Sequence, residues 1–321
     1  MRAVTFAGTG GNEVVSLAER PDPVPADHEV VVAARFAGVN WADVAQRMGI
    51  YPAPPGSPPD IPGLEVAGTV VAAGGGVRGW QVGDRVFGIV GGGGLADRVA
   101  VHERHVAAIP DNLADDMAAA VPEAYITAHD AVFGQGGLQL GEVLLVTGAN
   151  GAVGSAGVRL ALVAGARVVA SVRSAESARA LADEGAVVVS PDQVAERLQA
   201  LGGANVVLEL VGAPNLDADF AALALRGRII VVGTGAGEAA AVSLRGLMAR
   251  RATLRGTMLR ARPLEEKAMA VRSFTRSVVP VLAAGRALPV IDSIFPAAQV
   301  TAAFDYLTRP GKSGKVLLEF A

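Results

Sequence analysis

At 321 residues, the chain is long enough for two domains, and just over half of it is apolar. Its basic residues are scattered and its formal net charge is -3, which excludes the basic stripe of a nucleic-acid-binding protein. The absence of cysteine excludes disulfides, a thiolate nucleophile and a cysteine-ligated zinc site. The sequence shows neither a membrane-length apolar run nor a signal peptide, so we expect a soluble, cytoplasmic protein.

The first ~120 residues read as short strands joined by glycine and proline turns. Asn40 is a good N-cap for a short helix with Trp41, Val44 and Met48 on one face. The stretch 51–62 holds six prolines in twelve residues, which predicts an extended surface loop. The strands expected in this part are Glu29–Ala37, Leu64–Ala73 and Gly83–Val90.

From about Glu123 the pattern changes to alternating strands and helices, and six such strands predict a Rossmann-type parallel sheet. The strands expected are Val143–Thr147, Arg167–Ser171, Ala186–Val189, Val206–Leu210, Arg228–Val232 and Thr253–Gly256. The helices expected are Val153–Ala164, Ala175–Glu184, Gln193–Leu201, Asn215–Leu225 and Leu244–Arg250.

The C-terminal tail does not continue this rhythm. It predicts a helix over Leu264–Ala284, a strand near Val290, a helix over Ala297–Leu307 and a final strand over Lys315–Phe320. We therefore assign the tail to the first domain. The expected domains are residues 1–123 with 260–321, and residues 124–259, with the active site between them.

A glycine-rich turn follows the first strand of the predicted parallel sheet. Gly148, Gly151 and Gly154 stand three residues apart, and the next helix begins directly after them. Such a turn lets the backbone approach a pyrophosphate, whose charge the helix N-terminus meets. This predicts a dinucleotide site that also includes Asn150, Ala152 and Val153.

The end of the second strand discriminates between cofactors. An NAD-binding protein normally has an acidic residue there for the ribose hydroxyls, but this chain has Ser171, Arg173 and Ser174. The guanidinium of Arg173 suits a 2′-phosphate, so we predict NADPH as the cofactor. The alternative is that Arg173 is only solvated and Ser174 only caps the next helix.

Two further turns lie where cofactor contacts are expected, at the carboxyl ends of the fourth and fifth strands. They comprise Leu210, Val211 and Gly212, and Val232, Gly233 and Thr234. Each could also be an ordinary connection between a strand and a loop.

Six motifs together resemble the zinc-independent quinone oxidoreductases, the zeta-crystallin-like branch of the medium-chain dehydrogenase/reductase superfamily. They are Ala37–Asp43, Arg47–Pro52, Ile61–Val70, Val82–Val86, Tyr125–Ala128 and Gly311–Val316. The resemblance covers essentially the whole chain. It implies an α/β protein with a GroES-like, β-rich catalytic domain and a Rossmann NADPH-binding domain.

The chain departs from the zinc alcohol dehydrogenases of that superfamily. Those enzymes have a Cys at or beside the position of Asn40, and Gly-His-Glu where this chain reads Gly63-Leu64-Glu65. The His102 and His105 pair has no third ligand nearby, so we expect no metal. Without zinc, a conjugated acceptor such as a quinone or an enone is the expected substrate.

The resemblance also implies individual roles. Tyr51 matches a family tyrosine that donates a proton in enoyl reductases and lines the pocket in quinone reductases, or it only packs on its loop. Asn40 matches an Asn beside the nicotinamide, or only caps its helix. Thr127 and Lys312 match cofactor positions, and the expected substrate pocket includes Trp41, Tyr51, Phe87, Met258 and Arg260.

Three functions follow from these residues. The first is NADPH-dependent reduction of a quinone or conjugated enone, and the second is enoyl or enone reduction with Tyr51 as the proton donor. The third is a non-catalytic NADPH-binding or crystallin-like structural role. The family analogy implies a homodimer, and Thr253–Gly256 could form an exposed sheet edge that pairing would protect.

Overall fold

The computed structural model describes residues 1–174 and 178–320. They form two compact units, the first of residues 1–126 with the C-terminal segment from Leu259, and the second of Thr127–Met258. Unit 1 is therefore built from both ends of the chain, whereas unit 2 is a single continuous segment. No helix in the described part of the chain is long and apolar enough to span a membrane.

Unit 2 contains a six-stranded, all-parallel sheet in the order β11-β10-β9-β12-β13-β14, which confirms the predicted Rossmann-type fold. The chain order reverses between β9 and β12, where such sheets bind ligands at their carboxyl edge. The strands are β9 (Val143–Thr147), β10 (Arg167–Ser171), β11 (Val187–Val189), β12 (Ala204–Glu209), β13 (Leu223–Val231) and β14 (Thr253–Gly256).

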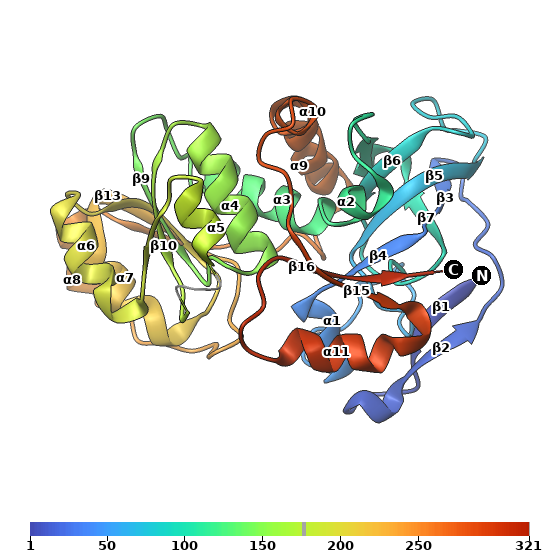
Figure 1. The fold of residues 1–321 in the computed structure, drawn as a ribbon, viewed down its shortest axis with the longest axis horizontal. Coiled ribbons are helices and arrows are strands. Elements are labelled where there is room, and N and C mark those ends of the chain that lie inside the picture. Colours follow the sequence, from blue (N-terminus) through green and yellow to red (C-terminus); the bar gives the residue numbers. More distant parts are fainter. Residues whose placement is uncertain (175–177, 321) are drawn as a thin grey trace. The chain divides into compact units, whose positions relative to one another are not determined.

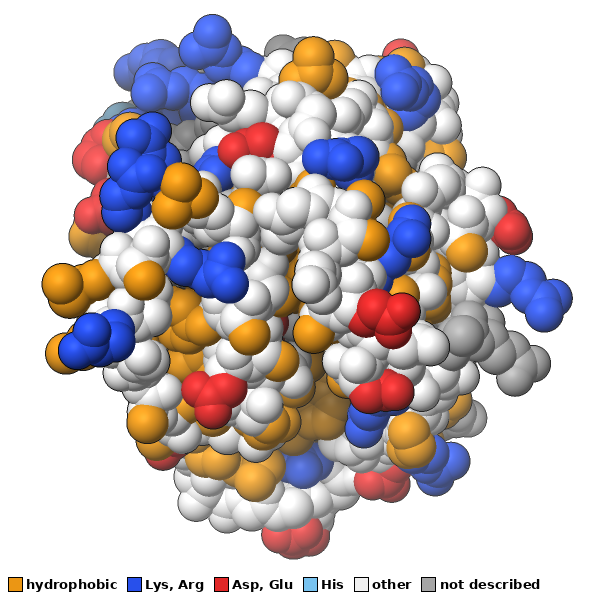
Figure 2. Space-filling model, turned by 90° about the vertical axis from the view of Figure 1, so that its left-hand side faces the viewer, with side chains coloured by type: hydrophobic (Ala, Val, Ile, Leu, Met, Phe, Trp, Pro, Cys, Tyr) orange, Lys and Arg blue, Asp and Glu red, His pale blue; other side chains and the backbone are white. Residues whose placement is uncertain are grey.

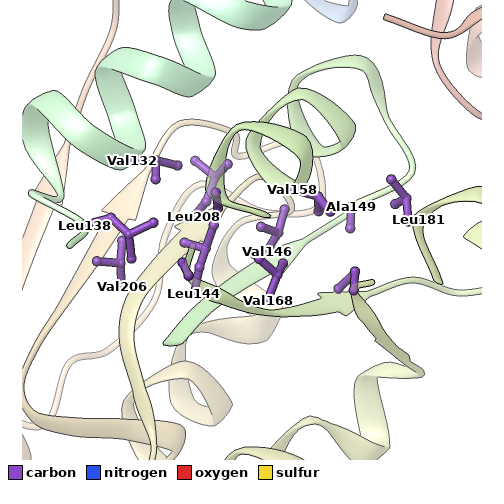
Figure 3. Packing of buried hydrophobic residues seen from close by; sticks show 14 of the residues in the cluster. Val132, Leu138, Leu144, Val146, Ala149, Val158, Val168, Leu181, Val206 and Leu208 are labelled. Carbon is purple, nitrogen blue, oxygen red and sulfur yellow. The ribbon is translucent and has the colours of Figure 1, made fainter. Parts of the chain in front are cut away.

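Successive residues of a strand point to opposite faces of the sheet, and the strands of unit 2 are apolar on both faces. Helices therefore cover both faces and bury these side chains. Leu144 and Val146 of β9 pack with Val158 of one helix (Figure 3), whereas Val143 and Leu145 pack on the other face. The helices of unit 2 are α4 (Ala152–Val163), α5 (Arg179–Asp183), α6 (Val194–Ala200), α7 (Leu216–Ala222) and α8 (Leu244–Arg250), shown around the strands in Figure 1. The π-helical turn Asp130–Gln135 precedes them.

One predicted helix end in unit 2 is wrong, and one predicted helix start falls outside the described residues. The helix expected over Asn215–Leu225 ends at Ala222, because the chain enters β13 at Leu223 and pairs there with Ala204. Propensity favours a longer helix, but the backbone pairing in the sheet overrides it. The first three residues of the helix expected over Ala175–Glu184 lie outside the described residues, and α5 begins at Arg179.

Unit 1 is β-rich, as predicted. A five-stranded antiparallel sheet has the order β7-β3-β5-β6-β8. A second sheet has the order β15-β16-β4, so the C-terminal strand pairs with a strand from the first 40 residues. The strands are β1 (Arg2–Phe6), β2 (Val15–Glu19), β3 (Glu29–Ala33), β4 (Phe36–Val39), β5 (Glu65–Ala73), β6 (Arg85–Ile89), β7 (Arg98–His102), β8 (Val106–Ala108), β15 (Ile291–Pro296) and β16 (Lys315–Glu319).

The helices of unit 1 depart from the sequence prediction at one proline. The helix expected over Leu264–Ala284 is divided at Val278, because Pro280 has no N–H to continue the backbone hydrogen bonds. The helices are α1 (Trp41–Arg47), α2 (Asp115–Ala119), α3 (Pro122–His129), which crosses into unit 2, α9 (Leu264–Ser277), α10 (Val279–Ala283) and α11 (Val300–Thr308).

In unit 1, one predicted strand is divided and one predicted loop is confirmed. The strand expected over Glu29–Ala37 is divided into β3 and β4, which belong to different sheets. The proline-rich stretch 51–62 has no helix or strand among its residues, all of which are described, so the predicted loop is confirmed.

Candidate functional site

The glycine-rich turn of unit 2 leads from β9 into α4, as the sequence predicts. Gly148 has φ +60°, a left-handed conformation that favours glycine. A Cβ on Gly154 would lie 2.5 Å from the Gly148 carbonyl oxygen, so no larger residue fits there. Gly151 is the N-cap of the twelve-residue helix α4, and it is exposed. The turn therefore presents open backbone at a helix N-terminus, which fits a pyrophosphate.

The neighbouring residues of the predicted dinucleotide site lie around this turn. Asn150, Ala152 and Val153 are partly exposed. At the end of β10, the side chain of Ser171 is buried, whereas Arg173 and Ser174 are exposed. The edge of the sheet therefore offers a guanidinium to solvent where an NAD-binding protein normally has a carboxylate.

The turns after β12 and β13 are joined by backbone hydrogen bonds. Ala236 N donates to Val211 O at 2.9 Å, and Ala213 N donates to Gly237 O at 2.9 Å. Thr147 ties the first of these turns to β9, because its hydroxyl accepts a hydrogen bond from Leu210 N at 2.9 Å. The two sets of predicted cofactor residues, Leu210, Val211 and Gly212, and Val232, Gly233 and Thr234, therefore lie in linked turns at the same sheet edge.

Unit 1 contains a buried charged cluster around Glu65. Lys315 Nζ lies 2.5 Å from Glu65 Oε1, and the two side chains are 2% and 1% exposed. Asn40 Nδ2 donates to the same carboxylate oxygen at 2.9 Å, and the backbone N–H of Glu123 donates to the other oxygen at 2.8 Å. The negative charge of Glu65 is thus compensated by an ammonium group and two hydrogen-bond donors.

Asn40 is central to this cluster. Its Oδ1 accepts a hydrogen bond from Lys315 Nζ at 2.6 Å, and its Nδ2 also donates to Gly38 O at 3.2 Å. It is also the N-cap of α1, as predicted, and its backbone N–H donates to Asp43 Oδ2 at 2.8 Å. A Cβ on Gly38 would lie 2.1 Å from Glu65 Oε1, so this position requires glycine. The amide of Asn40 is therefore held on both sides, and its role toward a ligand stays a prediction.

Asp43 anchors the start of α1 from inside unit 1. It is fully buried, and Gly63 N donates to its Oδ1 at 2.8 Å. Burial raises the pKa of the Asp43 carboxyl to about 6, against the lowering effect of its backbone donors.

Tyr51 is held in the proline-rich loop by Arg260. The guanidinium donates to Tyr51 O at 2.9 Å and to Gly91 O at 2.7 Å, and it also contacts the Gln46 side chain. It lies 5.0 Å from the centroid of the Tyr51 ring. Burial and nearby Glu123 raise the pKa of Tyr51 to about 12, despite the opposing charge of Arg260. The phenol is therefore a neutral hydrogen-bond donor at physiological pH.

The structure gives the remaining predicted residues different surroundings. Trp41 and Met258 are 59% and 52% exposed, and their place in a substrate pocket stays a prediction. Phe87 is fully buried against Phe274, which favours a core role. Thr127 is 8% exposed on α3, and Lys312 Nζ lies 6.0 Å from the Trp41 ring centroid.

Sequence reasoning missed several buried polar residues near these groups. Lys267 is 7% exposed and donates to Arg260 O at 3.0 Å. In unit 2, Glu209 and Asp219 are 0% and 2% exposed. For Glu209 the available signal was an acidic residue at the end of an otherwise apolar strand, since buried charges there are rare unless a partner is present. Asp219 and Lys267 lie on helices, where no such signal exists.

Comparison with known protein families matches both parts of the chain. Residues 152–275 match the zinc-binding dehydrogenase family model, and residues 26–111 match the alcohol dehydrogenase GroES-like domain.

Individual relatives extend over nearly the whole chain. A quinone oxidoreductase of Lama guanicoe is 31% identical over 99% of this chain and 97% of its own length. A quinone oxidoreductase-like protein 2 of Bos taurus is 33% identical over 93% of this chain and 86% of its own length.

Solved structures agree with the sequence relatives. The quinone oxidoreductase from Thermus thermophilus, solved also in complex with NADPH, is 33% identical, covers 100% of both chains and has a TM-score of 0.85. The fold, the glycine-rich turn and these relatives agree. The chain is therefore an oxidoreductase and belongs to the zinc-independent quinone oxidoreductase family of the medium-chain dehydrogenase/reductase superfamily.

Proposed function

We propose that the protein is an NADPH-dependent reductase that transfers hydride to a quinone or a conjugated enone without zinc. The observation that carries this proposal is the cluster of Asn40, Glu65 and Lys315. These residues come from the two segments where zinc-dependent relatives place metal ligands, together with the C-terminal strand. An ammonium group already lies 2.5 Å from the carboxylate there.

The donor set of this cluster does not fit zinc. Zinc sites in proteins use Cys, His and carboxylate ligands, but the chain has no Cys, and Leu64 stands where His would be needed. A divalent cation beside Glu65 would also have to displace the ammonium of Lys315. Carbonyl activation by a Lewis acid is therefore not part of the proposed mechanism.

The residues of unit 2 fit a nicotinamide dinucleotide. Gly151, the exposed N-cap of α4, has no atom closer than 3.5 Å to the place of a Cβ, so a pyrophosphate could approach the helix N-terminus there. The exposed guanidinium of Arg173 would bind a 2′-phosphate, which favours NADPH over NADH. When bound, the cofactor supplies hydride from C4 of its nicotinamide ring.

The phenol of Tyr51 supports a second candidate function. Its raised pKa keeps the hydroxyl protonated, so it can donate a hydrogen bond to a quinone oxygen or a proton to the α carbon of an enoyl substrate. Enoyl or enone reduction by the same protein is therefore the alternative. Arg260 orients the tyrosine for either reaction through the contact with Tyr51 O.

The test is NADPH oxidation by the purified protein with two acceptors in parallel, a small quinone and a short enoyl thioester. We expect turnover with the quinone and a drop of about tenfold in kcat/KM with Tyr51→Phe, since one hydrogen bond in the transition state is lost. Faster turnover of the thioester would instead assign enoyl reduction. Binding of NADPH with no turnover of either acceptor would support the non-catalytic role.

Cofactor preference has its own test. Arg173→Ala is expected to raise the Kd for NADPH about tenfold and to leave the Kd for NADH unchanged, since a charge-assisted hydrogen bond contributes about 1.5–3 kcal/mol. Arg167→Ala, which removes an exposed arginine at the other end of β10, is the matched control. Equal effects on both nucleotides would contradict the assignment of Arg173 to the phosphate.

We further propose a homodimer formed through β14. This strand is last in the sheet order, and all four of its residues are exposed, including Leu254 at 37%. Hydrophobic side chains lie among Lys and Arg on the side of the molecule that Figure 2 shows. Light scattering is expected to give twice the chain mass of 32.5 kDa, and a mass of one chain would contradict the dimer.

A further inference from the structure

Glu209 occupies the end of β12 with no solvent exposure. Its Oε1 accepts hydrogen bonds from Val211 N at 2.5 Å and from Gly212 N at 2.7 Å. The other oxygen accepts a hydrogen bond from Asn215 Nδ2 at 3.3 Å. The carboxylate therefore shapes the turn directly after its own strand.

The backbone of the same residue holds the second turn. Glu209 O accepts hydrogen bonds from Val232 N at 2.9 Å and from Gly233 N at 3.2 Å. Glu209 thus fixes both turns that the strand order places at the carboxyl edge of the sheet, next to the reversal between β9 and β12. Gly212 has φ +112°, so this turn depends on a conformation that glycine favours.

Asp219 of α7 is the partner of Glu209 inside unit 2. Asp219 is 2% exposed, and its buried Oδ2 has no hydrogen-bond donor among the described residues. The carboxyl group of Glu209 lies beside it, so a proton held by Asp219 can lie between the two groups. Burial and the neighbouring carboxylate of Glu209 raise the pKa of Asp219 to about 9. Two adjacent buried carboxyl groups cannot both ionise at neutral pH, so Asp219 keeps its proton and Glu209 carries the charge.

We propose that Glu209 is a positioning residue for the dinucleotide cofactor, and that neutral Asp219 holds it by donating a hydrogen bond to its carboxylate. This inference rests on the proposed function, because it requires that the Val211–Gly212 turn contact the cofactor. Without the Asp219 donor, the buried carboxylate of Glu209 has one hydrogen bond fewer. The charged form of Glu209 is then less stable, so Glu209 takes up a proton from solvent more readily. A protonated Glu209 is a weaker acceptor for Val211 N and Gly212 N, and the turn moves away from the shape that binds the cofactor.

The experiment measures the Kd of NADPH and of NADH by nucleotide fluorescence, which needs no acceptor and no turnover. Asp219→Leu is expected to raise the Kd of the nucleotide that binds about tenfold, as one hydrogen bond to a charged group is lost. Asp219→Asn, whose amide N–H replaces the carboxyl O–H, is expected to keep Kd within about twofold. Asp217→Leu on the exposed side of the same helix is the matched control and should leave Kd unchanged.

Glu209→Gln provides a second, near-isosteric test in case Asp219→Leu does not fold. Its amide N–H₂ would face the amide of Asn215, so Kd is expected to rise about fivefold with little change in Tm. If folded Asp219→Leu and Glu209→Gln both bind nucleotide as the wild type does, the role is only structural and the inference is overturned. If the wild-type protein binds neither nucleotide, the proposed function fails and the inference fails with it.

Discussion

Each unit buries a glutamate, and the two carboxylates differ in one partner. In unit 1, Glu65 at 1% exposure lies against the ammonium of Lys315. In unit 2, Glu209 at 0% exposure has backbone N–H groups, one amide and a protonated Asp219. Both carboxylates accept hydrogen bonds from an Asn amide and from the backbone, but Glu65 also has a cation and Glu209 has a neutral acid.

This difference determines whether the stability of a buried carboxylate depends on one residue or on pH. A buried carboxylate that is paired with a cation keeps only neutral hydrogen-bond donors when the cation is removed, as Glu65 would keep the Asn40 amide and the Glu123 N–H. A carboxylate that relies on several donors loses only part, but its compensation changes with pH because one donor is itself an acid. The stability of unit 1 should therefore depend strongly on Lys315, whereas the stability of unit 2 should depend on pH.

Removal of the cation should have the largest effect. Lys315→Met leaves Glu65 buried without a counter-charge, and we expect the free energy of unfolding to fall by about 3–5 kcal/mol. Urea denaturation measures this change. The double variant with Glu65→Gln should recover a large part of the loss, and a double variant as unstable as the single one would show that the charge of Glu65 is not the cause.

A smaller loss is expected from crowding the same ion pair. Gly38→Ala would place a methyl group 2.1 Å from Glu65 Oε1 and 2.5 Å from Lys315 Cε. The pair must separate, so the free energy of unfolding should fall by about 2 kcal/mol. Gly83→Ala is not a matched control because its φ is +99°, whereas Gly256→Ala tests a glycine with open space around it. Equal losses at positions 38 and 256 would contradict the crowding explanation.

The carboxyl pair of unit 2 should respond to pH. The pKa of Asp219 is raised from 3.8 to about 9 in the folded protein, so between these values the folded state holds a proton that the unfolded chain releases. The free energy of unfolding therefore falls as pH rises through this window. Asp219→Asn removes this dependence, so it should raise the free energy of unfolding at pH 8, with a gain that becomes small toward pH 4. A gain that is constant with pH would contradict proton linkage.

The smallest effect should come from an ion pair of similar length at the surface. Arg104 and Glu265 lie 2.6 Å apart, but their side chains are 46% and 69% exposed. Water already solvates both charges, so Arg104→Gln should leave the urea midpoint unchanged. A marked loss there would show that distance rather than burial decides the strength of these pairs.

Much of the fold could be predicted from the sequence because the central strands of unit 2 are unbroken apolar runs between glycine turns. The ends of β9, β10, β14 and α8 agree with the prediction at both termini. The early start of β13 depends on pairing with β12 that no local window contains. The division of the long helix follows from Pro280, a local signal that the prediction did not use.

The candidate site also has a part that the sequence predicts and a part that it does not. The Gly148–Gly154 turn is a local pattern, so the sequence alone predicts it. The cluster around Glu65 joins Asn40 to Lys315 across 275 residues, and only the pairing of β16 with β4 brings them together. Glu209 and Asp219 are close in sequence, but the strand pattern gives no sign that their carboxyl groups meet.

The pairing of β16 with β4 has a consequence for synthesis on the ribosome. Unit 2 is continuous, so all of its residues are available once residue 258 has emerged. Lys315, which balances the charge of Glu65, follows unit 2 in the chain. We therefore expect the second unit to complete its folding before the first, although the ribosome makes most of the first unit earlier.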